Sequence, residues 1–282
     1  MSQQIHWFPG HMKKALIEVE NKLKLVDCVI ELLDARIPLS SANKIIDNLV
    51  HNKAKLVALT KVDLADESET KKWIKYFENK GFAVIFADLT KNNDIKKIIS
   101  AAEKLGETKQ EKLMKKGLKP QAIRAMVLGI PNVGKSTLIN RISGRRAASV
   151  QNKPGHTRAQ QLIKVSNKFE LLDTPGILQS CYENDHQAMM LALTGSINID
   201  ILPVEQISKY AFDFMKNKYS SNLISRFPYL QEISDAGEAF INIAKTRGYF
   251  TKEDVDTTKA MKVFLNELKN GQIGRVTFER ID

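Results

Sequence analysis

Short apolar runs alternate with longer amphipathic segments over the first two thirds of the chain. The runs are rich in Val, Ile and Leu, which is typical of strands buried on both faces of a sheet. In the segments between most of them, apolar residues recur at helical spacing. The expected strands are Asp27–Leu33, Lys55–Thr60, Ala83–Ala87, Arg124–Gly129, Gln161–Val165 and Phe169–Asp173. The expected helices are Asn43–Asn52, Glu67–Lys80, Asp94–Leu105 and Gly134–Ser143.

This alternation predicts an α/β fold, a doubly wound and mostly parallel sheet with helices on both faces. The last two strands are expected to pair across a turn at Asn167. The basic and weakly apolar stretch Gly106–Pro120 fits either a linker or a solvated helix.

The pattern changes after about Cys181, where helical spacing continues without strands between the segments. This predicts a small all-helical domain. Ala211, Phe212, Met215 and Tyr219 share one stripe, which is more typical of core packing than of a cofactor site.

The length of the chain limits the number of domains, and its charge indicates the kind of partner. A chain of 282 residues suggests about two domains, and 43% hydrophobic with 27% charged residues excludes a disordered or fibrous protein. The net charge is +11, yet residues 183–282 carry 12 Lys and Arg against 14 Asp and Glu. The positive excess therefore belongs to the first 182 residues. It indicates a polyanionic partner, most simply nucleic acid, or else a solubilising surface.

The cysteine count and the absence of long apolar stretches indicate the compartment. Two cysteines, Cys28 and Cys181, are no disulfide framework, and Cys28 lies in an apolar run where we expect a buried, inert thiol. No apolar stretch approaches the ~20 residues of a membrane span, and MSQQIHWFPGHMKK carries no signal-peptide core. We expect a cytoplasmic protein without membrane association.

The strongest motif is GIPNVGKS, which matches the phosphate-binding loop G-x-x-x-x-G-K-[ST] between an expected strand and helix. Glycines let backbone N–H groups turn toward phosphate oxygens, Lys135 supplies positive charge, and the Ser136 hydroxyl is a ligand for Mg²⁺. The expected phosphate-binding residues are Gly129, Ile130, Pro131, Asn132, Val133, Gly134, Lys135, Ser136 and Thr137.

A second motif, LLDTPG, ends an apolar strand with an aspartate and places a glycine three residues later. Asp173 is expected to hold Mg²⁺ through water, and the Gly176 N–H to bond the γ-phosphate. In the preceding NKPGHTR segment, Thr157 is positioned to complete the Mg²⁺ ligands; in isolation it would be a surface residue.

The third motif, TKVD, consists of Thr60, Lys61, Val62 and Asp63 at the end of a strand. Asp63 can accept hydrogen bonds from guanine N1–H and the 2-amino group, and the stem of Lys61 can lie on the base. Adenine would leave the carboxylate unpaired, so such a site discriminates by ~10⁴ or more. Together with the other motifs, TKVD favours GTP over ATP.

The order of the motifs is unusual, because the base motif precedes the phosphate loop. A doubly wound sheet binds its ligand at the carboxyl ends of the strands whatever the chain order. A circular permutation keeps the site if the old termini are joined, and Gly106–Pro120 would be the joint.

Further motifs are WFPGHM, the DAR after the first strand, PGHT and DTPG, and a helical C-terminal region follows them. With these features the chain resembles the RbgA/YlqF-type circularly permuted ribosome-assembly GTPases over essentially its whole length. The resemblance implies a GTPase domain over residues 1–178, with an N-terminal extension that bears a histidine, and a helical domain over 179–282 that binds RNA and the ribosome. It further implies a Mg²⁺-dependent bacterial GTPase whose partners are GTP or GDP and the large ribosomal subunit precursor. We expect a monomer.

The sequence departs from the family pattern in three places. Thr60 stands where Asn is commoner, and FADLTKN is a degenerate form of the loop that backs the base. The helical domain has no basic excess. We therefore expect weaker guanine binding, and RNA contacts that depend on few residues of the helical domain.

Hydrolysis needs a group that orients water, and Ile177 after DTPG is apolar. The resemblance gives this role to His11 of WFPGHM; the alternative is a histidine that caps a helix or packs on Trp7. His156 and His186 are weaker candidates. In related GTPases an Asn at the position of Asn132 holds K⁺; the alternative is a loop residue bonded to backbone.

Arg36, Arg145 and Arg146 are expected to be exposed, either solvated or on RNA phosphates.

The predicted function is a GTPase that binds the immature large subunit in its GTP form and hydrolyses GTP there late in assembly. The alternatives are a nucleotide-gated RNA-binding switch with negligible hydrolysis and a GTPase that acts on another RNA.

Overall fold

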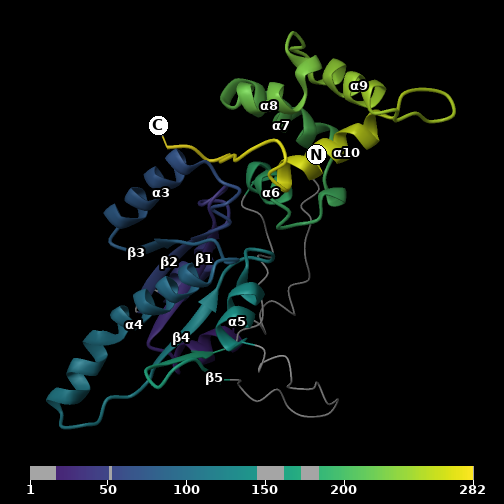
Figure 1. Cartoon of the computed structure of the whole chain (residues 1–282). Coiled ribbons are helices and arrows are strands. Elements are labelled where there is room, and N and C mark those ends of the chain that lie inside the picture. The colour runs from purple at the N-terminus through teal and green to yellow at the C-terminus, as the bar shows by residue number, and fades with distance from the viewer. Residues whose placement is uncertain (1–16, 51–52, 145–161, 173–183, 282) are drawn as a thin grey trace, which may run out of the picture.

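A computed structural model describes residues 17–50, 53–144, 162–172 and 184–281. Six strands form one sheet in the order β3-β2-β1-β4-β6-β5 (Figure 1). All pairs are parallel except β5 with β6. The strands are β1 Cys28–Asp34, β2 Ala54–Thr60, β3 Ala83–Phe86, β4 Ile123–Leu128, β5 Leu162–Lys164 and β6 Phe169–Leu172. The predicted α/β sheet is confirmed, including the antiparallel pairing of its last two strands.

Both faces of the sheet are buried at its central strands, such as β1 and β4. In β1, Cys28, Ile30 and Leu32 join one hydrophobic cluster, whereas Val29 and Leu33 join clusters on the opposite face. Successive side chains of a strand point to opposite faces. A strand covered on both faces is therefore mostly apolar, which is why the central strands appear as hydrophobic runs. Glu31 is an exception in β1, and the ammonium of Lys55 lies 2.9 Å from its Oε2.

Helices cover the two faces as predicted. Ile95 and Ile98 of α4 (Asn92–Lys115) pack on the same side as Leu138 of α5 (Lys135–Ser143). Trp73 of α3 (Glu67–Asn79) packs on the other side, as does Val50 of α2 (Lys44–Val50).

The expected end of a helix at Leu105 is wrong, because α4 continues to Lys115 and includes most of Gly106–Pro120. Of the two alternatives for this stretch, the solvated helix is the correct one for its larger part. Lys, Glu, Gln, Leu and Met are strong helix formers, and they dominate residues 107–115. A short loop then leads into β4.

The last third of the described chain is helical, as predicted. It contains α6 Asp185–Leu193, η2 Ile199–Ile201, α7 Val204–Lys218, α8 Ser220–Arg226, η3 Pro228–Leu230, α9 Ala236–Thr246 and α10 Thr257–Lys269. The stripe of Ala211, Phe212, Met215 and Tyr219 is buried, which confirms the expectation of core packing. The expected domain boundary between residues 178 and 179 lies outside the described residues.

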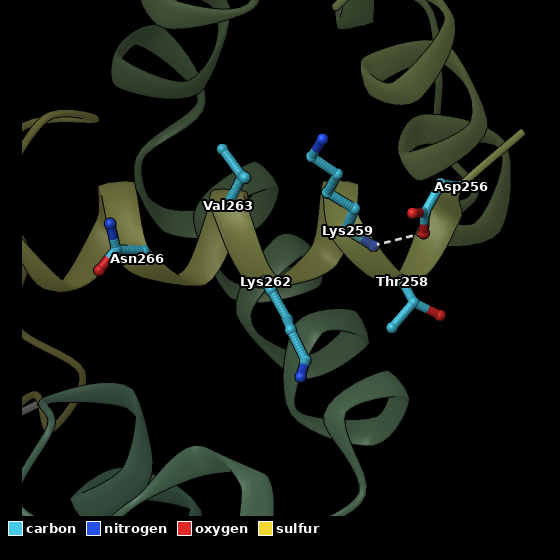
Figure 2. Close-up of a pocket in the computed structure, with 6 residues that line it drawn as sticks. All are labelled: Asp256, Thr258, Lys259, Lys262, Val263 and Asn266. Carbon is cyan, nitrogen blue, oxygen red and sulfur yellow. Dashed lines mark hydrogen bonds between the residues drawn. The ribbon is translucent and has the colours of Figure 1, made fainter. Parts of the chain in front are cut away.

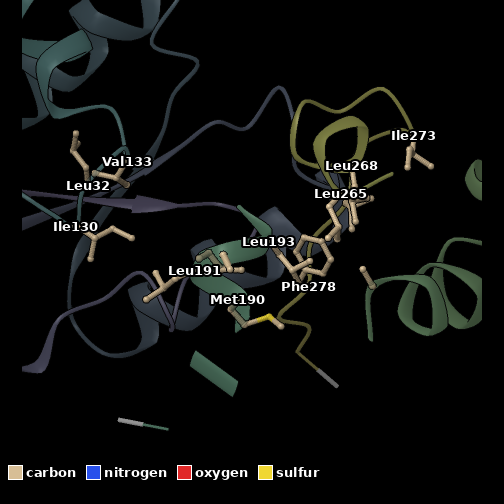
Figure 3. Close-up of a cluster of buried hydrophobic side chains, with 14 of the residues drawn as sticks. Leu32, Ile130, Val133, Met190, Leu191, Leu193, Leu265, Leu268, Ile273 and Phe278 are labelled. Carbon is tan, nitrogen blue, oxygen red and sulfur yellow. The ribbon is translucent and has the colours of Figure 1, made fainter. Parts of the chain in front are cut away.

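The helical part shares a hydrophobic core with the sheet. Figure 3 shows Leu32 and Val133 at one end of a buried cluster, Leu191 and Phe278 nearer its middle, and Leu268 and Ile273 toward the other end. After α10 the chain runs back along the molecule and ends beside α3 (Figure 1). We call residues 270–281 the C-terminal segment.

Two further expectations can be examined in the described residues. Cys28 is fully buried, and burial raises the pKa of its thiol to about 12, which confirms the buried, unreactive cysteine. Among the helices that the structure describes, none is long and apolar enough to cross a membrane.

Candidate functional site

The expected phosphate and base loops lie at the same edge of the sheet. The phosphate loop follows β4 and the TKVD loop follows β2, and β1 lies between these two strands. Because the three strands are parallel, their carboxyl ends meet at one edge, where doubly wound folds bind ligands. The sheet therefore brings together two motifs that are far apart in the sequence.

Backbone geometry explains both glycines of the phosphate loop. Gly129 has φ +149°, and a Cβ there would lie 2.7 Å from the Leu32 carbonyl oxygen. Gly134 has φ +113°, and its Cβ would lie 2.6 Å from a methyl carbon of Leu89, in the loop after β3. No other residue type fits these two positions without displacing its neighbours.

Lys135 and Ser136 are the first two residues of α5, directly after Gly134 of the phosphate loop. The ammonium of Lys135 donates to the carbonyl oxygens of Gly129 (2.9 Å) and Ile130 (2.5 Å), and burial lowers its pKa to about 8. The Ser136 side chain is exposed. A hollow of about 250 Å³ is lined by Asn132, Gly134, Lys135, Ser136 and Thr137.

Thr60 connects the two loops. Its hydroxyl lies 2.8 Å from the Val133 carbonyl oxygen in the phosphate loop and 3.1 Å from the Leu33 carbonyl oxygen. The side chain is fully buried. Thr60, one of the expected guanine-binding residues, therefore contacts the phosphate loop from within the protein.

Lys61 is anchored to a buried carboxylate. Its ammonium lies 3.1 Å from Oδ2 of Asp34, at the end of β1, and its backbone has φ +55°. Arg36 also binds Asp34, with Nε 3.0 Å from Oδ1 and Nη2 2.8 Å from Oδ2. Burial alone would raise the pKa of Asp34, but the charges of Arg36 and Lys61 outweigh it and lower the pKa to about 2.

The expectation that Arg36 is exposed is wrong, since only 2% of it is accessible. Besides binding Asp34, its guanidinium donates to the carbonyl oxygens of Thr194 (3.0 Å) and Lys269 (2.8 Å), at the ends of α6 and α10. A planar group with five donors can satisfy a carboxylate and two carbonyls at once, which compensates for burying its charge. Arg36 therefore joins the sheet to the helical part.

Asn132 makes a second junction with the helical part. It adopts φ +58°, and its amide nitrogen donates to the Gly195 carbonyl oxygen at 3.0 Å. This contact corresponds to the alternative of a loop residue bonded to backbone. A hollow of about 460 Å³ lies between Asn132 and the helical part, with Gly195, Asp200 and Lys262 in its lining.

Asp63 has an exposed side chain, and the structure describes no hydrogen bond or ion pair of its carboxylate. Its main chain is held from a distant part of the sequence, because Nε of Arg275 donates to the Asp63 carbonyl oxygen at 3.1 Å. A carboxylate without a protein partner at the carboxyl edge of the sheet is available to a ligand that carries N–H donors.

The remaining expected site residues lie outside the described part of the chain. They are His11, His156, Thr157, Asp173, Gly176 and Ile177, together with Arg145 and Arg146. His186 is described: it lies on α6 with an exposed side chain, and its ring is 6.1 Å from that of Tyr210. No group of three or more His, Cys, Asp or Glu suited to a metal occurs among the described residues.

A shallow hollow of about 390 Å³ lies on α10 (Figure 2). Both of its lysines are already engaged. Lys262 binds Asp200 at 2.9 Å, and the ammonium of Lys259 lies 4.6 Å from the centre of the Tyr249 ring. Asp256 accepts the backbone N–H of Lys259 as a helix cap. The hollow therefore offers little free chemistry for a nucleotide.

The motifs identified the two loops but missed the residues that support them. Asp34 and Arg36 carried a signal, since two charges directly after a buried strand form a short-range pair. No pattern in the sequence pointed to Tyr219 or Arg275, because their partners lie far away along the chain. Tyr219 bonds Asp66, and Arg275 bonds the Asp63 carbonyl oxygen.

The chain is similar to known proteins over nearly its whole length. The family model described as 50S ribosome-binding GTPase matches residues 124–218. Ribosome biogenesis GTPase A of Bacillus cereus is 44% identical over 276 residues, which cover 98% of this chain and 93% of that protein. The Thermotoga maritima protein of the same name is 34% identical over 97% of this chain and 94% of its own length. The solved structure of GNP-bound YlqF from T. maritima is similar with a TM-score of 0.68 at 29% identity, over 95% of this chain and 98% of that one.

Proposed function

The chain belongs to the ribosome biogenesis GTPase A family, and on this premise we propose that it binds the immature large ribosomal subunit in its GTP form and hydrolyses GTP on that particle. Family membership makes it a GTPase that acts in ribosome assembly. The observation that carries the proposal is the contact of Thr60 with the Val133 carbonyl, which links the base loop to the phosphate loop at one edge of the sheet.

The described residues support a guanine nucleotide at this edge. The hollow beside Lys135 and Ser136 suits the phosphates, because the start of α5 and the ammonium both favour anions. The carboxylate of Asp63 would accept from guanine N1–H and the 2-amino group, with the stem of Lys61 along the base. The salt bridge from Lys61 to Asp34 orients that stem.

Mg²⁺ fits the donors of the site. A hard cation prefers oxygen ligands, and the exposed Ser136 hydroxyl lies next to Lys135 in the lining of the phosphate hollow. Ser136, Thr157 and Asp173 would hold the ion, which when bound neutralises charge on the transferred phosphoryl group. Asn132 would hold K⁺ in a GTP-bound form in which its side chain has left Gly195.

Hydrolysis would depend on His11. Because Ile177 cannot polarise water, another group has to orient the attacking nucleophile. Binding to the particle would bring His11 and the segment after Asp173 into position, so that hydrolysis follows assembly of the site on the ribosome. The ribosomal RNA is a polyanion, which suits the basic excess of the first 182 residues.

GTP turnover with and without purified large ribosomal subunits, in K⁺ and in Na⁺ buffers, tests the proposal. We expect stimulation of about tenfold or more by the particle, lost in His11→Ala and in Lys135→Ala. A particle that binds tightly in the presence of GTP while turnover stays near zero would favour the nucleotide-gated switch. Equal stimulation by unrelated RNA would favour a GTPase that acts on another RNA.

A further inference from the structure

The C-terminal segment lies directly against the TKVD loop. Val276 N–H donates to the Leu64 carbonyl oxygen at 2.9 Å, and Asp66 N–H donates to the Thr277 hydroxyl at 3.1 Å. Farther along, the Trp73 ring nitrogen donates to the Glu279 carbonyl oxygen at 2.8 Å. The end of the chain is thus bonded to the loop and to the helix that follows it.

Arg275 makes the contact nearest to the expected base site. Its Nε donates to the Asp63 carbonyl oxygen at 3.1 Å, and its Nη2 donates to the Val62 carbonyl oxygen at 3.0 Å. These two carbonyls belong to Asp63 and to the residue before it. A guanidinium that bridges consecutive carbonyls restrains the two peptide planes on either side of the Asp63 Cα, because its donors are rigid and coplanar.

The loop depends on such support. Lys61 adopts φ +55°, a conformation that non-glycine residues rarely adopt. Within the loop, Leu64 N–H donates to the Lys61 carbonyl oxygen at 2.9 Å. The carboxylate of Asp63 has no described partner, so within the protein its position is restrained only through the backbone that carries its Cβ.

The helical part reinforces the same arrangement through Tyr219 at the end of α7. Its hydroxyl donates to Oδ2 of Asp66 at 3.1 Å and accepts from Thr277 N–H at 3.1 Å. Only 8% of Tyr219 is accessible. The segment and the loop are therefore fixed to each other and to α7 at one point.

We propose that Arg275 is a positioning residue for guanine recognition, which holds the backbone of Val62 and Asp63 so that the Asp63 carboxylate faces the base. The inference rests on the proposed guanine nucleotide site. It makes the specificity of that site depend on a residue that lies more than 200 positions away in the sequence. A merely stabilising role would instead leave the choice of base unchanged.

Equilibrium binding of GDP, IDP and ADP to the full-length protein separates the two roles. Inosine lacks the 2-amino group, so the ratio of the IDP to the GDP dissociation constant reports how well Asp63 meets that group. In Arg275→Ala we expect the ratio to fall about fivefold or more, toward the value of Asp63→Ala. A misdirected Asp63 carboxylate loses its charged hydrogen bond with the 2-amino group, which only GDP offers. Arg275→Lys, which keeps a donor, should restore part of the ratio.

Arg280→Ala is the matched control. Arg280 also lies in the C-terminal segment, but it binds Glu69 at 3.0 Å on α3. We expect its IDP to GDP ratio to stay within about twofold of the wild-type value. An unchanged ratio in Arg275→Ala, with a strong effect of Asp63→Ala, would overturn the positioning role while keeping the guanine site. If Asp63→Ala also leaves the GDP, IDP and ADP affinities unchanged, the guanine site itself is refuted, and the role of Arg275 with it.

Discussion

Replacement of Arg36 by methionine should lower the free energy of unfolding by about 3–5 kcal/mol. The guanidinium is buried and makes bidentate contacts with Asp34, and it also donates to the carbonyl oxygens of Thr194 and Lys269. Methionine keeps much of the stem but leaves Asp34 inside the protein with only the ammonium of Lys61 opposite it.

The magnitude follows from burial. Removing one partner of a buried ion pair costs about 3–5 kcal/mol; here Asp34 stays desolvated with Lys61 as its one cationic partner, and the carbonyls of Thr194 and Lys269 lose their donor. An exposed pair contributes only about 0–1 kcal/mol. Arg124→Met is the matched control, since Arg124 binds Glu170 at 3.0 Å with 46% of its side chain accessible. Arg36→Met should therefore cost several times as much as Arg124→Met.

Urea denaturation followed by circular dichroism and by tryptophan fluorescence measures both variants. Because Arg36 joins the sheet to the helical part, both signals should shift. Adding Asp34→Asn to Arg36→Met should recover at least about 1 kcal/mol, since the buried carboxylate charge, left with Lys61 alone, is then removed. Equal losses in Arg36→Met and Arg124→Met, or no recovery in the double variant, would refute the account of Arg36 as a buried junction.

Three further predictions follow from single groups. Thr60→Val should destabilise the protein by about 1–3 kcal/mol and weaken nucleotide binding, because the Val133 carbonyl loses its partner. Thr60→Ser keeps the hydroxyl and should retain both stability and binding. Denaturation measures the stability of the two variants, and titration with GDP measures their binding. The folded pKa of Asp34, about 2, lies below its unfolded value, so its contribution is complete above about pH 4 and lost as pH falls toward 2. Wild type should accordingly lose about 2 kcal/mol more than Asp34→Asn over that range in acid denaturation, and an equal loss would contradict the assignment. In a Cys181→Ser variant, the buried Cys28 should react with a thiol reagent only as fast as the protein unfolds, and rapid labelling of the folded protein would show that its thiol is accessible.

Sequence patterns predicted the elements whose identity depends on local chemistry. The strands were recognisable because a strand with two buried faces is mostly apolar, as Cys28 to Leu33 illustrate with Glu31 as their single charged residue. The phosphate loop was recognisable because Gly129 and Gly134 cannot be replaced without a clash. Both signals are contained in a few consecutive residues.

Features that arise from packing could not be predicted in this way. Arg36 follows a strand with a charged residue two positions before it, which is typical of a solvated loop. The carbonyls that receive its buried guanidinium lie far away in the sequence, at the ends of α6 and α10. The extension of α4 to Lys115 was missed for another reason. A helix with a mostly polar surface shows little hydrophobic periodicity, although its residues favour the helix.

One corner of the helical part is connected to both loops of the site, to the phosphate loop directly and to the TKVD loop through Arg36 and Asp34. Lys61 and Asn132 are the two non-glycine residues with positive φ in the described chain, and each belongs to a different loop. Asn132 donates to the Gly195 carbonyl, while Lys61 is linked through Asp34 and Arg36 to the carbonyl of the preceding residue, Thr194. Two consecutive residues at the end of α6 therefore brace both loops, so a displacement of this corner would act on the phosphate and base loops together.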